Sequence, residues 1–252
     1  MHSELLLKHG LINRVAGSDY NFRYQTVGNN VTEDVNRLLN EMNVSPDAIY
    51  SGQQGHTAHI AYVDGKNGED FAYGKTFKDT DGLITDKKNV ALLIKYADCT
   101  PIVLFDPVQK VLASVHSGWR GTVEKIGKRA VDRMVEEFHC KKEDILAYVG
   151  PSIDQANYEV GKDVYDAFAS FDNRNYFFEP KGEKFLLSMT DANLSVLLEA
   201  GLLEDHIEIE RVSTYTDDRL HSARQEGPTY GLNGILTMMT DAVKPFKALI
   251  DE

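Results

Sequence analysis

The chain has 252 residues, of which 42% are hydrophobic and 26% are charged, and this composition is typical of a folded globular protein rather than a disordered one. Its length suffices for a single domain with a sizeable core, so we expect one domain over residues 1–252. The formal charge of −12 at pH 7 argues against a nucleic-acid partner, because no surplus of Lys and Arg can replace the counterions of a phosphate backbone.

The N-terminal segment predicts a protein that stays in the cytoplasm. Its three leucines are followed at once by Lys8 and His9, so the apolar stretch is too short for a secretion signal. No later apolar run approaches the length of a membrane-spanning helix, so we expect no membrane partner. Cys99 and Cys140 are then expected as reduced thiols. The sequence carries no signal for the oligomeric state.

In the first half of the chain, hydrophobic spacing predicts one helix among several strands. A strand and a loop are expected over residues 4–25, and a helix then begins at Thr32, whose hydroxyl caps it and whose next two residues are acidic. Residues 64–80 are polar and contain glycine, which predicts a long loop. Short apolar runs bounded by turn residues predict strands at residues 48–54, 58–63, 90–94, 101–106 and 111–117.

In the second half, helices and strands alternate irregularly. Helical spacing of apolar residues is found from Val123 to Phe138 and over 158–171, and a further helix begins at Asp191. Residues 172–187 predict an aromatic loop. The irregular alternation favours mixed sheets in a single α+β domain over a doubly wound parallel sheet. The strands expected here lie at residues 145–149, at 207–216 and at the end of 219–239.

Two residues that can bind metal stand at the ends of neighbouring predicted strands, Cys99 and His116. A thiolate and an imidazole together suit zinc or copper, and they need a third ligand from elsewhere. His56 and His59 lie upstream, and in a strand they would face opposite sides, so at most one of them is expected to join. The same Cys99–His116 pair could instead serve as the nucleophile and base of a cysteine hydrolase.

Five segments of the chain resemble the laccase-domain family, also described as YfiH-like or polyphenol oxidase, over residues 15–240. The resemblance implies a layered α/β/β/α arrangement, and it implies a zinc-dependent purine nucleoside phosphorylase with adenosine deaminase side activity, acting on a nucleoside and phosphate. It also implies that His56, Cys99 and His116 are the metal ligands. The segments are QGHT around His56, DGLITD from Asp81, ADCTP around Cys99, HSGWRGT from His116 and GPSIDQANYEV from Gly150.

Four further residues are candidates for roles in catalysis or substrate binding. Arg120 stands beside a helix start, where it could bind phosphate or instead pack on Trp119. Asp98 precedes the candidate ligand Cys99, so it could orient a ligand histidine or act as an acid–base group. Glu159 is a candidate general acid or base. Arg224 is a second candidate for binding an anion.

The sequence departs from the family pattern near its C-terminal end. The family often shows Ser-x-Arg-Arg followed by a Gly-Arg pair, whereas this chain has Gln225 in SARQ and then Leu232 after Gly231. If the missing arginines hold substrate, the preference or rate should differ here. His221 stands where the family commonly has an aromatic residue, which makes it a candidate pocket residue rather than a ligand.

Two other functions compete with the phosphorylase. Two histidines and a cysteine also fit a copper site, but a multicopper laccase needs His-x-His pairs, and none of the eight histidines forms one. Copper capture in vitro is nevertheless expected, because copper outcompetes zinc at most sites. A protein that binds or edits a nucleotide-linked cell-wall precursor also has precedent in the family.

Overall fold

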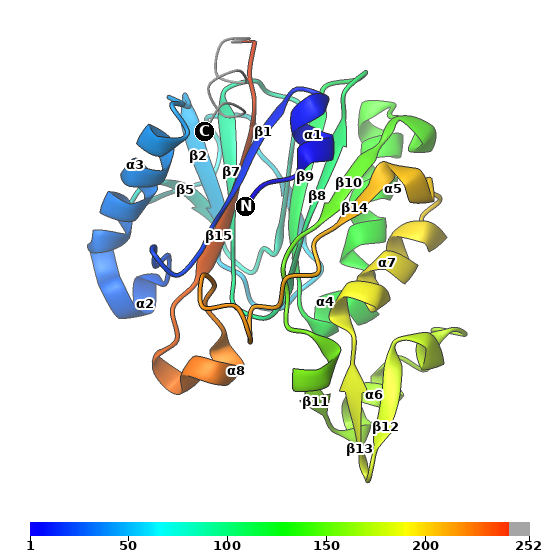
Figure 1. Cartoon of the computed structure of the whole chain (residues 1–252). Helices are drawn as coiled ribbons and strands as arrows, with labels where there is room; N and C mark the ends of the chain where they lie inside the picture. Colours follow the sequence, from blue (N-terminus) through cyan, green and yellow to red (C-terminus); the bar gives the residue numbers. More distant parts are fainter. Residues whose placement is uncertain (242–252) are drawn as a thin grey trace.

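The computed structural model describes residues 1–241 and arranges most strands in two six-stranded sheets stacked face to face (Figure 1). The first sheet has the order β1 (Leu11–Ala16), β15 (Asn233–Met239), β7 (Val90–Tyr96), β2 (Ala48–Gly52), β5 (Gly74–Phe77) and β4 (Glu69–Phe71). The second has the order β14 (Ile207–Ile209), β10 (Leu146–Val149), β8 (Thr100–Asp106), β9 (Val111–Ser117), β6 (Gly82–Thr85) and β3 (Ile60–Tyr62).

Both sheets contain parallel and antiparallel pairs. In the first sheet β7 is parallel to β2 and antiparallel to β15, and in the second sheet β6 is parallel to β3 and antiparallel to β9. The predicted α+β fold with mixed sheets is therefore confirmed.

Alternating residues of the central strand β7 show how the layers pack. Leu92 and Ile94 lie in the core between the two sheets, whereas Ala91 and Leu93 face helix α3 (Val31–Glu41). Two helices, α5 (Ile126–Phe138) and α7 (Met189–Glu199), cover the outer face of the second sheet (Figure 1). The resulting order is helix, sheet, sheet, helix.

A smaller unit lies below the second sheet in Figure 1. Its three strands are β11 (Glu159–Val160), β13 (Lys184–Leu187) and β12 (Phe178–Lys181), and helix α6 (Lys162–Ala167) packs against them. Four phenylalanines form the centre of its core, and they are Phe168, Phe171, Phe177 and Phe178.

Short helices fill the connections. Four of them are α1 (Glu4–Lys8), α2 (Tyr24–Val27), α4 (Trp119–Val123) and α8 (Ala223–Glu226). Helix α1 was not expected, and Ser3 caps it by accepting a hydrogen bond from the Leu6 amide. No helix among residues 1–241 has the length and apolar character that crossing a membrane requires.

Two segments predicted as loops contain strands, so both predictions were wrong, and in each the outer strand of the hairpin, β4 or β12, is polar. Residues 64–80 form the β4–β5 hairpin at the edge of the first sheet, and residues 172–187 contain the β12–β13 hairpin. Edge strands expose one side to solvent, so their sequences are polar and lack the apolar run expected of a strand.

Two predicted elements are shorter than expected. The helical pattern over 158–171 is helical only from Lys162 to Ala167, because Glu159 and Val160 pair with β13. The strand expected over 207–216 ends at Ile209, and the chain beyond it forms a loop that Ser213 fastens to Asp154. In both cases hydrogen bonds to a distant segment decide the structure.

Candidate metal centre and its cavity

Three side chains from separate segments converge where the lower ends of the two sheets meet. The ligand atoms of His56, Cys99 and His116 all lie within 4.8 Å of one another, and His56 Nε2 is 3.9 Å from Cys99 Sγ. His56 lies in the loop between β2 and β3, Cys99 in the link between β7 and β8, and His116 near the end of β9. Within residues 1–241 this is the group of His, Cys, Asp and Glu side chains placed to hold a metal ion.

One buried carboxylate positions both histidines. Asp81, the residue directly before β6, accepts a hydrogen bond from His116 Nδ1 at 2.8 Å and one from the His56 amide at 3.1 Å. Its other oxygen accepts from the Gly55 and Thr57 amides, which holds the loop with His56 in a left-handed conformation at φ +63°. Because Nδ1 of His116 is occupied, Nε2 remains to bind a metal.

The position of Asp81 was not predicted, although the residue opens the DGLITD segment. Asp98 is the carboxylate that its sequence position suggests for orienting a ligand histidine or for acid–base chemistry. Asp98 instead accepts hydrogen bonds from Thr214 Oγ1 and from the Arg224 amide, both at 2.7 Å. Its buried carboxylate therefore joins two distant loops beside Cys99 and contacts neither candidate ligand histidine.

Electrostatic interactions among Cys99, His116 and Asp81 shift the pKa values at the candidate metal centre. Burial disfavours ionisation of the Cys99 thiol, but His116 and His56 outweigh that effect and lower the pKa of Cys99 to about 6. Burial likewise opposes charge on His116, whereas the Cys99 thiolate and Asp81 raise its pKa to about 9. A thiolate is the form in which cysteine binds metal, and a metal cation can replace the proton of the facing imidazolium.

Gly118 leaves room for two of the candidate ligands. A Cβ atom at this position would lie 2.9 Å from His56 Cδ2 and 3.1 Å from Cys99 Sγ. We expect Gly118→Ala to lower the affinity for a divalent metal ion by roughly 10-fold or more, because the displaced candidate ligands lose their geometry. Metal titration against a competing chelator measures this change.

Gly121→Ala, in the next turn of the chain, is the matched control for Gly118→Ala. Its Cβ would meet its nearest atom, the Thr57 carbonyl oxygen, at an ordinary 3.4 Å. Gly121→Ala should therefore leave the affinity for the metal ion unchanged. Equal affinity of the Gly118 and Gly121 variants would contradict the steric argument.

Arg120, Arg224 and the partly buried Tyr158 lie close enough to Cys99 for their charges to interact. The Arg120 guanidinium stacks over Trp119 at 4.3 Å, and that of Arg224 lies 5.2 Å above Tyr158. Burial raises the pKa of Tyr158, the negative charges of Cys99 and Asp98 add to that shift, and the two arginines oppose it. Tyr158 therefore lies among these charges, a position that the sequence argument missed although the residue belongs to the NYEV segment.

Glu159 projects away from this group. Its carboxylate pairs with Lys181 at 3.0 Å and with Lys184 at 3.1 Å, while its carbonyl oxygen accepts from Arg224. These contacts place the Glu159 carboxylate on the smaller unit, beside the β12–β13 hairpin.

Two other histidines lie outside the centre. His59 pairs with Thr80 Oγ1 through Nδ1 and is not one of the three converging side chains. The ring of His221 lies between the Tyr20 carbonyl oxygen and the Glu226 carboxylate, so its contacts are structural.

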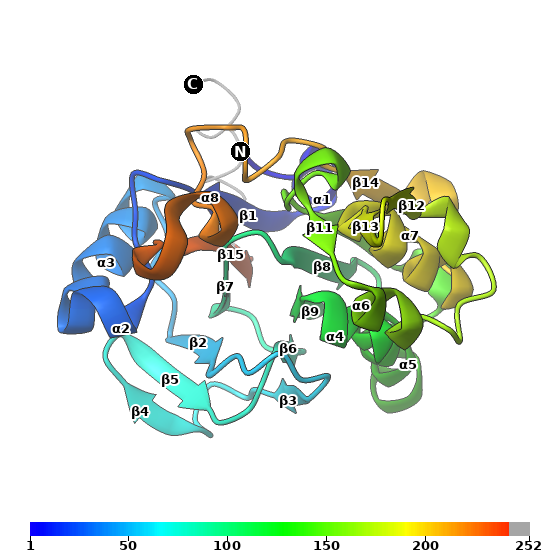
Figure 2. The same ribbon diagram turned by 90° about the horizontal axis from the view of Figure 1, so that it is seen from below.

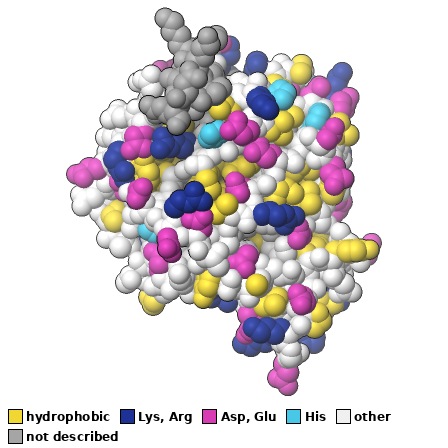
Figure 3. Space-filling view, in the orientation of Figure 1, with side chains coloured by type: hydrophobic (Ala, Val, Ile, Leu, Met, Phe, Trp, Pro, Cys, Tyr) yellow, Lys and Arg dark blue, Asp and Glu magenta, His cyan; other side chains and the backbone are white. Residues whose placement is uncertain are grey.

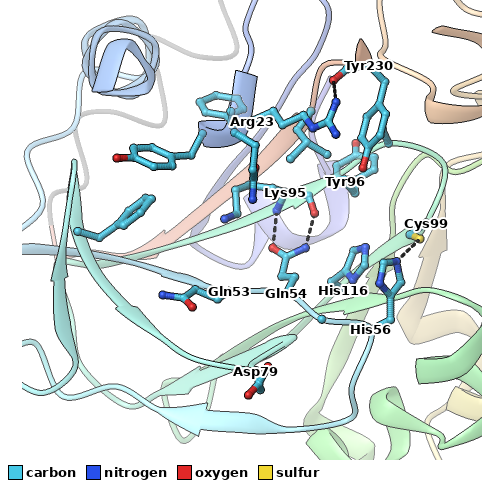
Figure 4. Close-up of a pocket in the computed structure, with 17 residues that line it drawn as sticks. Arg23, Gln53, Gln54, His56, Asp79, Lys95, Tyr96, Cys99, His116 and Tyr230 are labelled. Atoms are coloured by element: carbon cyan, nitrogen blue, oxygen red, sulfur yellow. Dashed lines mark hydrogen bonds between the residues drawn. The ribbon is translucent and has the colours of Figure 1, made fainter. Parts of the chain in front are cut away.

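A cavity of about 620 Å³ opens beside the candidate metal centre (Figure 4). The three candidate ligands form one end of it, and loops beside the first sheet form the rest. Figure 2 shows the lower ends of both sheets, where these loops lie. The aromatic residues that line the cavity are Phe22, Tyr24, Phe71, Tyr96 and Tyr230. The amide and cationic residues that line it are Gln25, Gln53, Gln54, Arg23 and Lys95.

Known proteins resemble this chain in sequence and in fold. A purine nucleoside phosphorylase of Bacteroides thetaiotaomicron is 36% identical over 166 residues, which cover 62% of this chain but only 60% of that protein. The adenosine deaminase RL5, from an unknown prokaryotic organism, is 32% identical over 77% of this chain and 76% of its own. The crystal structure of YlmD from Geobacillus stearothermophilus matches with a TM-score of 0.82 at 24% identity, over 92% and 93% of the two chains.

The family assignment rests on a match that spans both sheets. A family model described as multi-copper polyphenol oxidoreductase laccase matches residues 13–240, from β1 to β15. The three converging side chains all lie within this match, as do the five segments in which the resemblance was first seen. The chain therefore belongs to the multi-copper polyphenol oxidoreductase laccase family.

Proposed function

We propose that this protein is a zinc-dependent purine nucleoside phosphorylase, which converts adenosine or inosine and phosphate to the free base and ribose 1-phosphate. The observation that carries the proposal is the convergence of His56, Cys99 and His116 at one end of an aromatic cavity. Relatives named as purine nucleoside phosphorylases support the substrate class.

Zinc suits the donor set of the candidate centre. Two imidazoles and one thiolate are ligands of tetrahedral zinc, and three protein ligands leave one position open. When bound there, zinc supplies a positive charge that can hold a phosphate oxygen or acidify a water. Copper fits the same three donors, so copper binding in vitro is part of the proposal.

The chain offers separate groups for the base and for the phosphate. The aromatic cavity suits a purine, because base rings stack on aromatic faces. Arg120 and Arg224, whose charges act on Tyr158, are proposed to bind phosphate, since a guanidinium matches phosphate oxygens. Asp98 would hold the Arg224 loop in place through the Arg224 amide.

The role proposed for Glu159 requires a change in its contacts. To act as a general acid or base, its carboxylate must leave Lys181 and Lys184. Glu159→Gln tests this role, because loss of turnover with unchanged zinc content is the result that supports it.

Adenosine deamination is the second candidate activity. The relative named adenosine deaminase RL5 is similar over 77% of this chain, compared with 62% for the purine nucleoside phosphorylase of Bacteroides thetaiotaomicron. Polyphenol oxidation by a multicopper cluster is disfavoured, since all eight histidines lie within residues 1–241 and this part of the chain contains one candidate metal centre. A cysteine hydrolase or a protein that edits a cell-wall precursor remains as the alternative use of Cys99 and His116.

Product analysis distinguishes these functions. Adenosine and inosine are incubated with the zinc-loaded protein, with and without phosphate, and the products are separated by chromatography. Free base that forms only with phosphate is the expected result, while inosine formed from adenosine without phosphate reports deamination. Absence of both products would overturn the proposed function and favour the hydrolase or the precursor-binding alternative.

The setting of the protein follows from the same centre. We place it in a reducing compartment, the cytoplasm, because a Cys99 ligand must remain a free thiol, and both cysteines are free in the structure. We also propose that the chain works as one domain, because residues of both sheets contribute to the centre.

The surface in Figure 3 shows Lys and Arg side chains interspersed with Asp and Glu, with no basic patch on this face.

A further inference from the structure

The cavity beside the candidate metal centre contains a lysine without a carboxylate partner. Lys95, near the end of β7, lines the cavity, and its ammonium donates a hydrogen bond to the Gly52 carbonyl oxygen at 3.2 Å. Within residues 1–241 it forms no ion pair, although Asp79 also lines the cavity. The charge of Asp81 acts on this ammonium without forming an ion pair, so its remaining N–H donors can serve a group that enters the cavity.

The backbone of Lys95 is held in place by Gln54. The Gln54 amide accepts a hydrogen bond from the Lys95 amide at 3.0 Å and donates one to the Lys95 carbonyl (Figure 4). This pairing continues the contact between β2 and β7 beyond the last residue of β2. The strand direction at Lys95 is therefore fixed, and its side chain emerges on the α3 side of the sheet, as those of Ala91 and Leu93 do.

The other cation of the cavity is already engaged. Arg23 donates to the carbonyl oxygens of Pro228 and Tyr230, and its guanidinium stacks over the Tyr230 ring at 3.8 Å (Figure 4). Phe71 and Tyr24 continue the aromatic lining, with ring centroids 5.2 Å apart. The cavity thus combines aromatic faces with an ammonium that donates to the Gly52 carbonyl oxygen and has further N–H donors, which is the chemistry that recognises a flat heterocycle bearing hydrogen-bond acceptors.

Building on the proposed function, we infer that Lys95 is the residue that stabilises the departing purine, by donating from its ammonium to the acceptor edge of the base. In phosphorolysis the bond between C1′ and N9 breaks and its electron pair moves onto the purine, while a phosphate oxygen forms the new bond to C1′. The purine leaves with a negative charge and takes up one proton, which Lys95 supplies and regains from water. An ammonium interacts more strongly with this developing charge than with the neutral nucleoside, so it lowers the barrier.

The electrostatics of Lys95 agree with this role. Burial lowers the pKa of Lys95 to about 8, and the negative charge of Asp81 opposes that shift. A proton donor whose pKa lies near neutrality transfers its proton more readily than an exposed lysine does.

The test compares inosine with 7-methylinosine, whose ring already carries the positive charge that Lys95 would supply. With inosine, Lys95→Met should lower kcat by about 100-fold, which is the usual contribution of a positioned acid. With 7-methylinosine, which departs as a neutral base, the same variant should keep its rate within about threefold, because no negative charge develops. Steady-state release of base at saturating phosphate measures both rates.

Controls separate this inference from a structural effect and from the proposed function itself. Lys66→Met removes an exposed lysine outside the cavity and should change neither rate. Zinc content and melting temperature show whether Lys95→Met is folded. If Lys95→Met does not fold, the same rates are measured on Lys95→Gln, which keeps a donor for the Gly52 carbonyl oxygen. Equal losses with both substrates would overturn the role of Lys95 alone, whereas a parent protein that releases no base from either nucleoside would overturn the proposed function and this inference together.

Discussion

Replacing Cys99 with serine should remove zinc and lower phosphorolysis by roughly 1,000-fold or more, because the neutral hydroxyl cannot substitute for a thiolate ligand. The neighbouring imidazoles lower the pKa of the Cys99 thiol, which favours the thiolate form that binds metal. Zinc per chain, measured by mass spectrometry of the dialysed protein, and base release from inosine are the two measurements. A variant that keeps both would contradict the assignment of Cys99 as a ligand.

Cys140→Ala is the control for the Cys99 substitution. Cys140 is buried against the second sheet, and burial, together with nearby Asp106, raises the pKa of its thiol, so it resists forming a thiolate. Its loss should lower the free energy of unfolding slightly while leaving zinc content and turnover unchanged. The comparison also tests the hydrolase alternative, because a metal-free protein that loses hydrolytic activity with a thiol reagent would favour Cys99 as a nucleophile.

Asp81→Asn should have the second largest effect on zinc binding, although the Asp81 side chain would not contact the metal. Both carboxylate oxygens accept hydrogen bonds, and the amide that replaces one of them can only donate. Either the contact to His116 or the contacts to the His56 loop must then be lost. We expect zinc affinity to fall by about 10- to 100-fold.

The same substitution should also lower stability, by about 1–3 kcal/mol, because buried donors lose their acceptor. Zinc affinity by competition and the melting temperature of the metal-free protein separate the two effects. Asp86→Asn is the matched control, since that carboxylate pairs with Tyr62 and Lys87 at the surface. An Asp81 variant that binds zinc as tightly as the control would show that the histidines do not depend on this carboxylate.

The sequence predicted the central strands well because their burial leaves a direct pattern. Strands β7, β8 and β9 appear as apolar runs, and Cys99 and His116 stand out as polar residues where those runs end. His56 could be chosen over His59 only through the family resemblance. Its loop is not part of a strand, and the hydrogen bonds of Asp81 determine the direction of its side chain.

Residues whose role depends on distant segments were harder to predict. Asp81 acts through two loops that meet only in the folded protein, so nothing in its local sequence distinguishes it from Asp86 or Asp98. The β4–β5 hairpin was missed because the polar residues of an edge strand resemble those of a loop. For Lys95 a signal did exist, since a charged residue in an otherwise buried strand is unusual.

The origin of the three candidate ligands has a consequence for folding. His56 follows a strand of the first sheet, His116 ends a strand of the second, and Cys99 lies on the segment that crosses between the sheets. A metal held by all three can be bound only when the sheets are docked, so its binding free energy adds to the cohesion of the two halves. Metal supply would then govern how long the chain resists unfolding and proteolysis, in addition to its chemistry.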